Sequence, residues 1–127
     1  HLEEHRAKKE EIYHTYERAF ADLPVRMNPY LPDSRPNFWL SCLTIDPGCA
    51  VTPEQLRLAL QAENIEARPI WKPMHLQPVF QGRAFLTAAE KPVGEDIFAR
   101  GLCLPSDVKN TPADMERVIE TVKRVFA

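Results

Sequence analysis

The sequence lacks the features that mark membrane-spanning, secreted and nucleic-acid-binding proteins. No apolar run in its 127 residues approaches the roughly 20 that cross a bilayer, and no signal peptide is visible. Its 18 acidic residues outnumber its 16 basic ones, giving a formal net charge of −2, whereas a general nucleic-acid binder usually carries a basic stripe. We therefore expect neither a membrane nor a nucleic acid among its partners.

Cysteine is also scarce. The three cysteines, Cys42, Cys49 and Cys103, are an odd number and contain no CxxC pair, which argues against a disulfide framework and against a zinc site. Cys42 and Cys103 lie in apolar, strand-like runs, so we expect them to be buried thiols. This usage fits a reducing, cytoplasmic setting.

A metal site at the start of the chain is not expected either. His1 and His5 are four residues apart, a spacing that places two side chains on one face of a helix. A zincin has glutamate directly after the first histidine, and that position here is Leu2. No third ligand is evident nearby, so we interpret both histidines as exposed helix residues.

What remains is the composition of an ordinary globular domain, with 44% apolar and 27% charged residues. The length corresponds to one domain, 1–127. There is no initiator Met, and the chain opens inside a helical pattern. We therefore expect this domain to be a piece of a longer protein.

Hydrophobic periodicity and helix-capping signals predict an α+β fold. The expected elements are helix 2–22, loop 24–37, strand 38–45, helix 53–64, an extended part of 67–80, helix 92–100, strand 102–104 and helix 112–126. This order predicts a small domain with about three mainly antiparallel strands and helices packed on one face. Strand 38–45 is expected to point Trp39, Ser41, Leu43 and Ile45 one way. Because it is apolar on both faces, we expect it to be covered on both sides.

The segment 67–80 is the most unusual part of the chain. It holds three prolines, two aromatic residues, two cations and a histidine. Each proline fixes φ and removes a backbone donor, so the segment should be neither helix nor ordinary strand. A rigid loop that carries Trp71, Lys72 and His75 suits ligand binding. The alternative is a proline-rich connector whose Trp71, Met74 and Phe80 fill the core.

This segment carries a family resemblance. Residues 68–80 read Arg-Pro-Ile-Trp-Lys-Pro-Met-His-Leu-Gln-Pro-Val-Phe, which resembles a segment in the small C-terminal domain of the pyridoxal-phosphate sugar aminotransferases of the DegT/DnrJ/EryC1/StrS family. The likeness continues through 101–106 and the final helix. It implies the small domain of the type I aspartate-aminotransferase fold. It also implies a large domain upstream that holds pyridoxal phosphate.

The resemblance also implies an activity. The Trp-Lys-Pro-Met-His version is similar to members that act on nucleotide-linked 4-keto-6-deoxy sugars, for example UDP-4-keto-6-deoxy-N-acetylglucosamine in cell-surface polysaccharide synthesis. Glutamate would supply the amino group, and the full-length protein would be a homodimer. The Schiff-base lysine of the family lies in an upstream motif, and this chain has no Gly-rich phosphate loop. We therefore expect no catalytic or cofactor-binding residue here, Lys72 included, and an inactive fragment.

Four residues are the candidate substrate contacts. By the resemblance, His75 would lie near the phosphate or sugar, where an imidazole can hydrogen-bond a diphosphate oxygen. Lys72 would supply a point charge, Trp71 an apolar plate and Arg68 a bidentate anion clamp. The alternatives are that Trp71 belongs to the core, that Arg68 pairs with Glu66, and that Lys72 is simply exposed.

Two other functions stay open on the sequence. A dehydratase or a 3-keto-sugar aminotransferase of the same family would share the fold, and the dehydratase is marked by a histidine in place of the upstream lysine. A free-standing, non-enzymatic α+β binding or oligomerisation module would instead have its own start codon just before His1.

Overall fold

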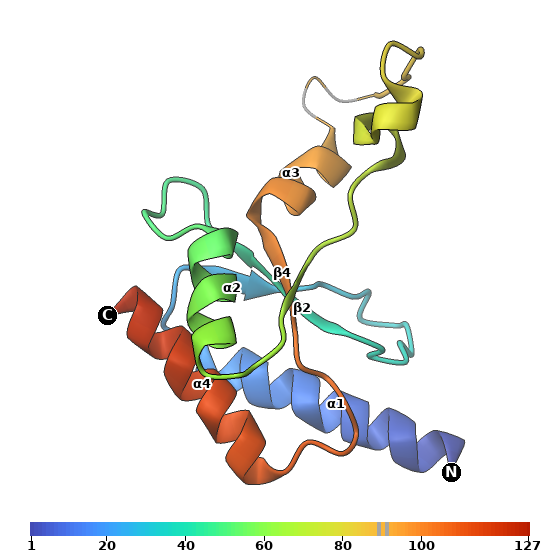
Figure 1. Ribbon diagram of the computed structural model, residues 1–127. Helices are drawn as coiled ribbons and strands as arrows, with labels where there is room; N and C mark the ends of the chain where they lie inside the picture. Colours follow the sequence, from blue (N-terminus) through green and yellow to red (C-terminus); the bar gives the residue numbers. More distant parts are fainter. Residues whose placement is uncertain (89, 91) are drawn as a thin grey trace.

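The computed structural model describes residues 1–88, 90 and 92–127 (Figure 1). In chain order the elements are α1 (Leu2–Ala19), β1 (Val25–Met27), β2 (Ser41–Ile45), α2 (Pro53–Ala62), β3 (Arg68–Pro69), the 3-10 turns η1 (Met74–Leu76) and η2 (Pro78–Phe80), α3 (Val93–Arg100), β4 (Gly101–Leu104) and α4 (Pro112–Phe126). No helix in the described ranges is long and apolar enough to cross a membrane.

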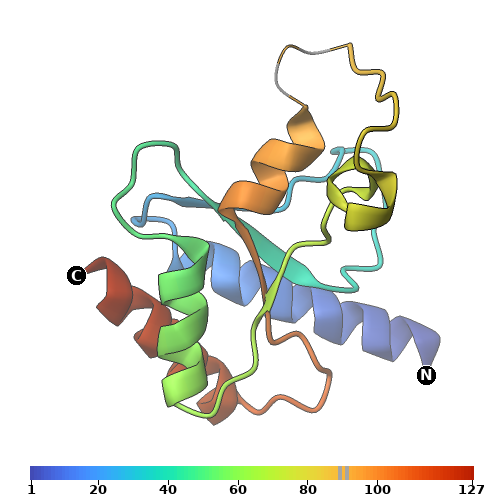
Figure 2. The ribbon, with the colours of Figure 1, turned by 45° about the horizontal axis from the view of Figure 1, so that its top comes forward.

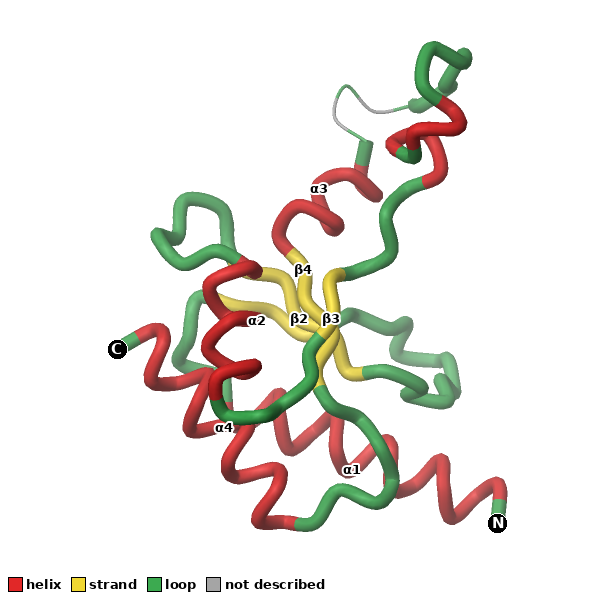
Figure 3. The backbone as a smooth tube through the Cα atoms, viewed as in Figure 1, coloured by secondary structure: helices red, strands yellow, loops and turns green. Residues whose placement is uncertain are grey.

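The strands of this part of the chain form one sheet with the order β1-β2-β4-β3. All three pairings are antiparallel, so the α+β class and the antiparallel sheet are confirmed. One strand more than expected is present, because β1 lies inside the segment that was predicted to be a loop. Its three residues fit between Pro24 and Pro29 and pair with β2 at one edge of the sheet, the position in which flanking prolines are tolerated. Figure 3 shows β2, β4 and β3 together at the centre of the molecule.

Three helices cover one face of the sheet, as predicted. Leu43 of β2 is paired with Leu102 of β4, and both face the core together with Ile45 and Leu104. Against them pack apolar residues of α1, α2 and α4: Ile12, Tyr16, Phe20, Leu56, Leu60, Met115, Val118 and Val122. In Figure 1 these three helices lie on one side of the sheet, whereas α3 and the turns η1 and η2 project beyond it.

Local signals place the starts of the helices well, whereas α2 ends at Ala62 rather than at residue 64. Thr52 and Thr111 each form a capping box, with Gln55 and with Asp114 respectively, and each is followed by a proline in the first turn, as expected. The first helix ends at Ala19 rather than at residue 22. The chain turns there because Leu23 N–H donates to the Phe20 carbonyl instead of continuing the helical ladder.

The expected strand 38–45 begins only at Ser41. Phe38 has φ = 49°, a left-handed conformation that breaks the extended chain. The alternation of burial therefore holds for Ser41, Leu43 and Ile45, all of which are buried, but it does not reach Trp39. That residue is 63% exposed, so the expectation that it shares one face with Ser41, Leu43 and Ile45 was wrong. The opposite face of β2 is only half covered, because Cys42 and Thr44 are half-buried.

Candidate functional site

The segment 67–80 leaves the sheet as two short turns. After β3, which pairs Arg68 with Cys103, Pro73 is the N-cap of η1 and Pro78 is the first residue of η2. Each 3-10 turn is closed by backbone hydrogen bonds, among them Gln77 N–H to the Met74 carbonyl at 3.0 Å. The segment thus holds no α-helix, as expected, but it does contain the two-residue strand β3 and two short 3-10 turns. Figure 2 shows these turns lying beside α3, outside the main body.

His75 is held between two residues from later in the chain. Its Nε2 lies 2.7 Å from Glu95 Oε1, and its ring stacks on Phe85 with centroids 3.7 Å apart and an interplanar angle of 17°. Glu95 belongs to the first turn of α3. A carboxylate that accepts from Nε2–H fixes both the orientation and the tautomer of a neutral imidazole, which leaves Nδ1 as the second polar atom of the ring.

The two predicted cations are both exposed. Arg68 Nε and Nη2 reach Glu66 Oε1 at 2.9 and 2.6 Å, so the pairing considered from the sequence is present. An anionic ligand at Arg68 would have to compete with this exposed carboxylate. Lys72 is also an exposed residue, and its backbone carbonyl accepts a 3.5 Å hydrogen bond from the Gln77 side chain.

Trp71 is not a core residue. It is 59% exposed, and its ring lies 5.6 Å from that of Trp39 at an interplanar angle of 40°. Met74 is 62% exposed and Phe80 is half-buried, so the alternative in which these side chains fill the core is wrong for Trp71 and Met74. Trp39 was not predicted to share a site with Trp71. The left-handed turn at Phe38, which the sequence did not reveal, puts it there.

Two hollows adjoin this tryptophan pair. One, of about 450 Å³, is lined by Trp39, Leu40, Glu66, Arg68, Pro69, Trp71, Cys103, Leu104, Pro105 and Ser106. The other, of about 410 Å³, is lined by Asn28, Pro29, Tyr30, Pro36, Asn37, Phe38, Trp39, Leu40, Cys42 and Trp71. The structure thus brings Arg68 and Trp71 together, whereas His75 and Lys72 line neither hollow. The four predicted residues fall into two groups, one at the sheet and one in the projecting segment.

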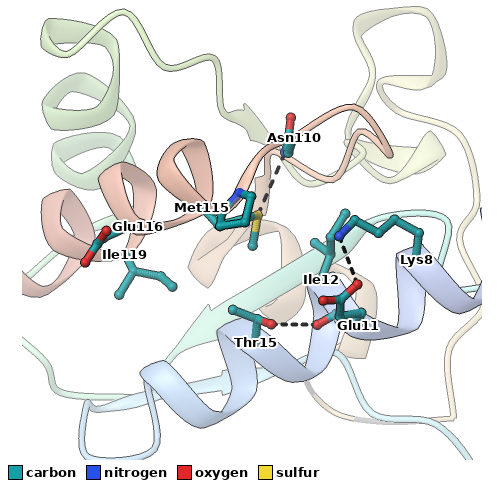
Figure 4. Close-up of a pocket in the computed structure, with 9 residues that line it drawn as sticks. Lys8, Glu11, Ile12, Thr15, Asn110, Met115, Glu116 and Ile119 are labelled. Atoms are coloured by element: carbon teal, nitrogen blue, oxygen red, sulfur yellow. Dashed lines mark hydrogen bonds and ion pairs between the residues drawn. The ribbon is translucent and has the colours of Figure 1, made fainter.

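A third pocket, between α1 and α4, contains none of the predicted residues (Figure 4). It measures about 370 Å³ and is lined by Lys8, Glu11, Ile12, Thr15, Asn110, Pro112, Met115, Glu116 and Ile119. Its cation is already paired, since Lys8 Nζ lies 2.9 Å from Glu11 Oε2. We therefore place no candidate site here.

The described residues do not fit a pyridoxal phosphate site. Such a site needs a lysine for the Schiff base, an acid for the pyridinium nitrogen and a phosphate cup. Lys72 is exposed, and Lys9 donates to the backbone carbonyls of Trp39 and Ser106. Gly48 and Gly82, the glycines with positive φ, lie in turns of the chain and not in a glycine-rich loop. No catalytic step is assigned to these residues.

Comparison with known proteins identifies the relatives of this chain. The profile of the DegT/DnrJ/EryC1/StrS aminotransferase family matches residues 1–123. EpsN of Bacillus subtilis, to which a pyridoxal phosphate-dependent aminotransferase activity is attributed, is 39% identical over 98% of this chain and 32% of its own length. The GDP-perosamine synthase of Caulobacter vibrioides is 32% identical over 98% of this chain and 33% of its own length.

The fold has the same relatives. A DegT DnrJ EryC1 StrS aminotransferase from Brucella abortus superposes with a TM-score of 0.82 at 22% identity, covering 98% of this chain and 32% of that protein. The chain therefore spans about a third of the length of the proteins it matches.

Proposed function

Because the chain belongs to the DegT/DnrJ/EryC1/StrS aminotransferase family, we propose that it is the C-terminal small domain of a pyridoxal phosphate-dependent sugar aminotransferase and contributes to substrate recognition. The observation that carries the proposal is the match over residues 1–123, nearly the whole chain. The parent protein transfers an amino group from glutamate to a nucleotide-linked 4-keto-6-deoxy sugar. The cofactor is held by the two thirds of the parent that lie outside this chain.

The preferred substrate is UDP-4-keto-6-deoxy-N-acetylglucosamine, in cell-surface polysaccharide synthesis. The motif Trp71–His75 supports this choice by its resemblance to members that use such sugars. The name of the Caulobacter vibrioides relative, a GDP-perosamine synthase, supports a nucleotide-linked sugar as the substrate class. The parent works in the cytoplasm as a homodimer.

In this proposal His75 is the residue that contacts the substrate most directly. Its ring is held by Glu95 and Phe85, so a hydrogen bond that Nδ1 accepts from a sugar hydroxyl requires little further loss of side-chain freedom. Lys72 adds positive charge near the diphosphate, and Trp71 offers its exposed ring as an apolar surface. Arg68 binds an anion only after releasing Glu66.

A visible absorption spectrum with pyridoxal phosphate tests whether the Schiff-base lysine lies outside this chain. It is taken on this chain and on the full-length parent, before and after adding glutamate. The proposal expects an aldimine band in the parent only, lost on adding glutamate. A genuine aldimine band in this chain would overturn the assignment of the Schiff base to the missing part. No band in either protein would favour a non-enzymatic binding module.

The identity of the product then separates the activities within the family. The parent is incubated with glutamate and, in separate reactions, with the UDP-linked 4-keto sugar or a 3-keto sugar, and the product is analysed by mass spectrometry. The proposal expects the 4-amino sugar. A deoxygenated sugar with no new nitrogen would identify a dehydratase instead, and amination of only a 3-keto sugar would identify the other alternative.

A further inference from the structure

Cys42 and Cys103 face each other across the two central strands of the sheet. They are direct partners in the antiparallel register of β2 and β4. Their Sγ atoms are 3.5 Å apart although the residues are 61 positions apart in the sequence. The sequence placed both among buried thiols but gave no reason to pair them.

The backbone hydrogen bonds of Cys42 show which type of antiparallel residue pair it forms with Cys103. Its N–H donates to Asn28 Oδ1 at 2.8 Å, and its carbonyl accepts from Asn28 N–H at 2.8 Å. Both backbone groups of Cys42 therefore point toward β1 and away from β4. This makes Cys42 and Cys103 a non-hydrogen-bonded pair, the closer of the two antiparallel types, with Cα atoms about 4.5 Å apart. That spacing falls within the range of roughly 4.4–6.8 Å found in disulfides.

Each cysteine also lines a hollow at the surface of the described structure. Cys103 lines the hollow that contains Arg68 and Trp71, and the half-buried Cys42 lines the adjoining hollow on the other side of Trp39. A molecule the size of a peroxide fits into either space.

The two thiols of the pair differ in acidity. Cys42 donates its S–H to Cys103 Sγ. This hydrogen bond lowers the pKa of Cys103 and, together with burial, raises the pKa of Cys42. The thiolate is the reactive form of cysteine, so Cys103 is the member that an oxidant attacks first.

We propose that Cys42 and Cys103 form a peroxide-sensitive dithiol that closes into an intrachain disulfide between β2 and β4. The Cys103 thiolate attacks hydrogen peroxide, which gives a sulfenic acid and hydroxide. The Cys42 sulfur then attacks the Cys103 sulfur, the S–O bond breaks, and the Cys42 proton leaves with the hydroxyl group as water. Overall, two thiols and one peroxide give one disulfide and two waters, and a dithiol reductant reverses the reaction.

The test is peptide mapping of this chain after mild hydrogen peroxide and alkylation of the remaining thiols. Circular dichroism confirms beforehand that each sample is folded. We expect a linked peptide pair containing Cys42 and Cys103, loss of two of the three thiols, alkylated Cys49, and return of all three thiols after dithiothreitol. The melting temperature of the oxidised chain should rise by several degrees, because a bond across a long loop restricts the unfolded state.

Two variants make the result specific. Cys49→Ser removes the half-buried thiol outside the pair and should leave the linked peptide unchanged. Cys42→Ser should abolish it and leave Cys103 to oxidise further to the sulfinic acid. The proposal is overturned if Cys42 and Cys103 are recovered as free thiols while Cys49 is oxidised, or if the thiols are lost only into bonds between chains. The wild-type map decides between these results even if a variant does not fold.

Discussion

His75 and Glu95 are joined by a 2.7 Å contact between Nε2 and Oε1, although they lie 20 residues apart and on different elements. The contact ties η1 to the start of α3, and Phe85 closes the other side of the imidazole. A histidine on an otherwise exposed projecting segment is thereby given one orientation. Glu95 is therefore a positioning residue for His75 in the proposed substrate site.

In the full-length parent, His75→Ala should raise KM for the nucleotide sugar by about tenfold, the equivalent of one hydrogen bond at ~1.4 kcal/mol. Glu95→Ala should raise it by less, and Glu95→Gln, which can still hydrogen-bond the ring, by less again. kcat should change little in all three. Steady-state kinetics with a fixed glutamate concentration measure these values.

A matched control exists on α1, where His14 Nδ1 contacts Glu17 Oε2 at 2.9 Å. His14→Ala removes the same kind of pair and should leave KM unchanged. If His75→Ala behaves like His14→Ala, the His75–Glu95 pair serves only to hold the segment in place. The assignment of His75 to the substrate site would then be wrong.

Gly101, the first residue of β4, is expected to tolerate no side chain. A Cβ there would lie 2.6 Å from the Ile97 carbonyl oxygen and would also overlap Ile70. Its backbone is extended, with φ = −102°, so the need for glycine is one of space and not of conformation. Gly101→Ala should lower the free energy of unfolding by roughly 1–3 kcal/mol, the usual cost of overpacking.

Gly94 in α3 provides the control for that substitution. A Cβ at Gly94 would meet only Pro73 Cγ at 3.7 Å, an ordinary contact distance. Gly94→Ala should be neutral or stabilising by up to ~1 kcal/mol, because alanine favours helix more than glycine does. Urea titration followed by circular dichroism measures both variants, and equal stabilities of the two would contradict the packing described at β4.

The two tryptophans predict an uncommon fluorescence signature. Trp39 and Trp71 are the only tryptophans of the chain, and they are 63% and 59% exposed in the folded state. Unfolding therefore adds little water around either indole. During a urea titration the emission maximum should shift only slightly while the far-ultraviolet circular dichroism signal is lost completely. A large red shift would mean that the pair is covered in solution.

The pH dependence of stability should include a contribution from Asp114. Its hydrogen bonds with Thr111 lower its pKa from the ordinary value of 3.8, as expected for a carboxylate at a helix N-terminus. A lowered folded-state pKa means that the contribution is present above the unfolded value and is lost as the pH falls below it. Wild type should therefore be more stable than Asp114→Asn at pH 6, with the difference shrinking below about pH 4.

Denaturant midpoints at several pH values check this prediction. Asp107→Asn is a useful comparison, because Asp107 accepts a backbone hydrogen bond from Lys109 outside any helix. If the stability difference between wild type and Asp114→Asn does not depend on pH between 3 and 6, the helix cap is not the source of the effect.

Much of the fold follows from local sequence signals. The capping boxes at Thr52 and Thr111 and the regular apolar spacing of the helices locate α2 and α4, because these interactions involve residues three or four positions apart. The proline spacing of 67–80 likewise excludes an α-helix and a long strand there. The family resemblance rests on the same segment. The match of the family profile to residues 1–123 confirms the family.

The remaining features depend on contacts between residues far apart in the sequence, which only the tertiary structure decided. The sequence could not place β1, whose pairing partner lies beyond a proline-rich loop, or the turn at Phe38 that brings Trp39 against Trp71. It named His75 but not Glu95 or Phe85, which hold the ring. It found two apolar strands with a cysteine in each, whereas the register of β2 against β4 alone made Cys42 and Cys103 neighbours. Short-range hydrogen bonds and the periodicity of apolar residues involve neighbours in the sequence and can be recognised from it. Strand register and side-chain contacts across the sheet arise only when the whole core packs.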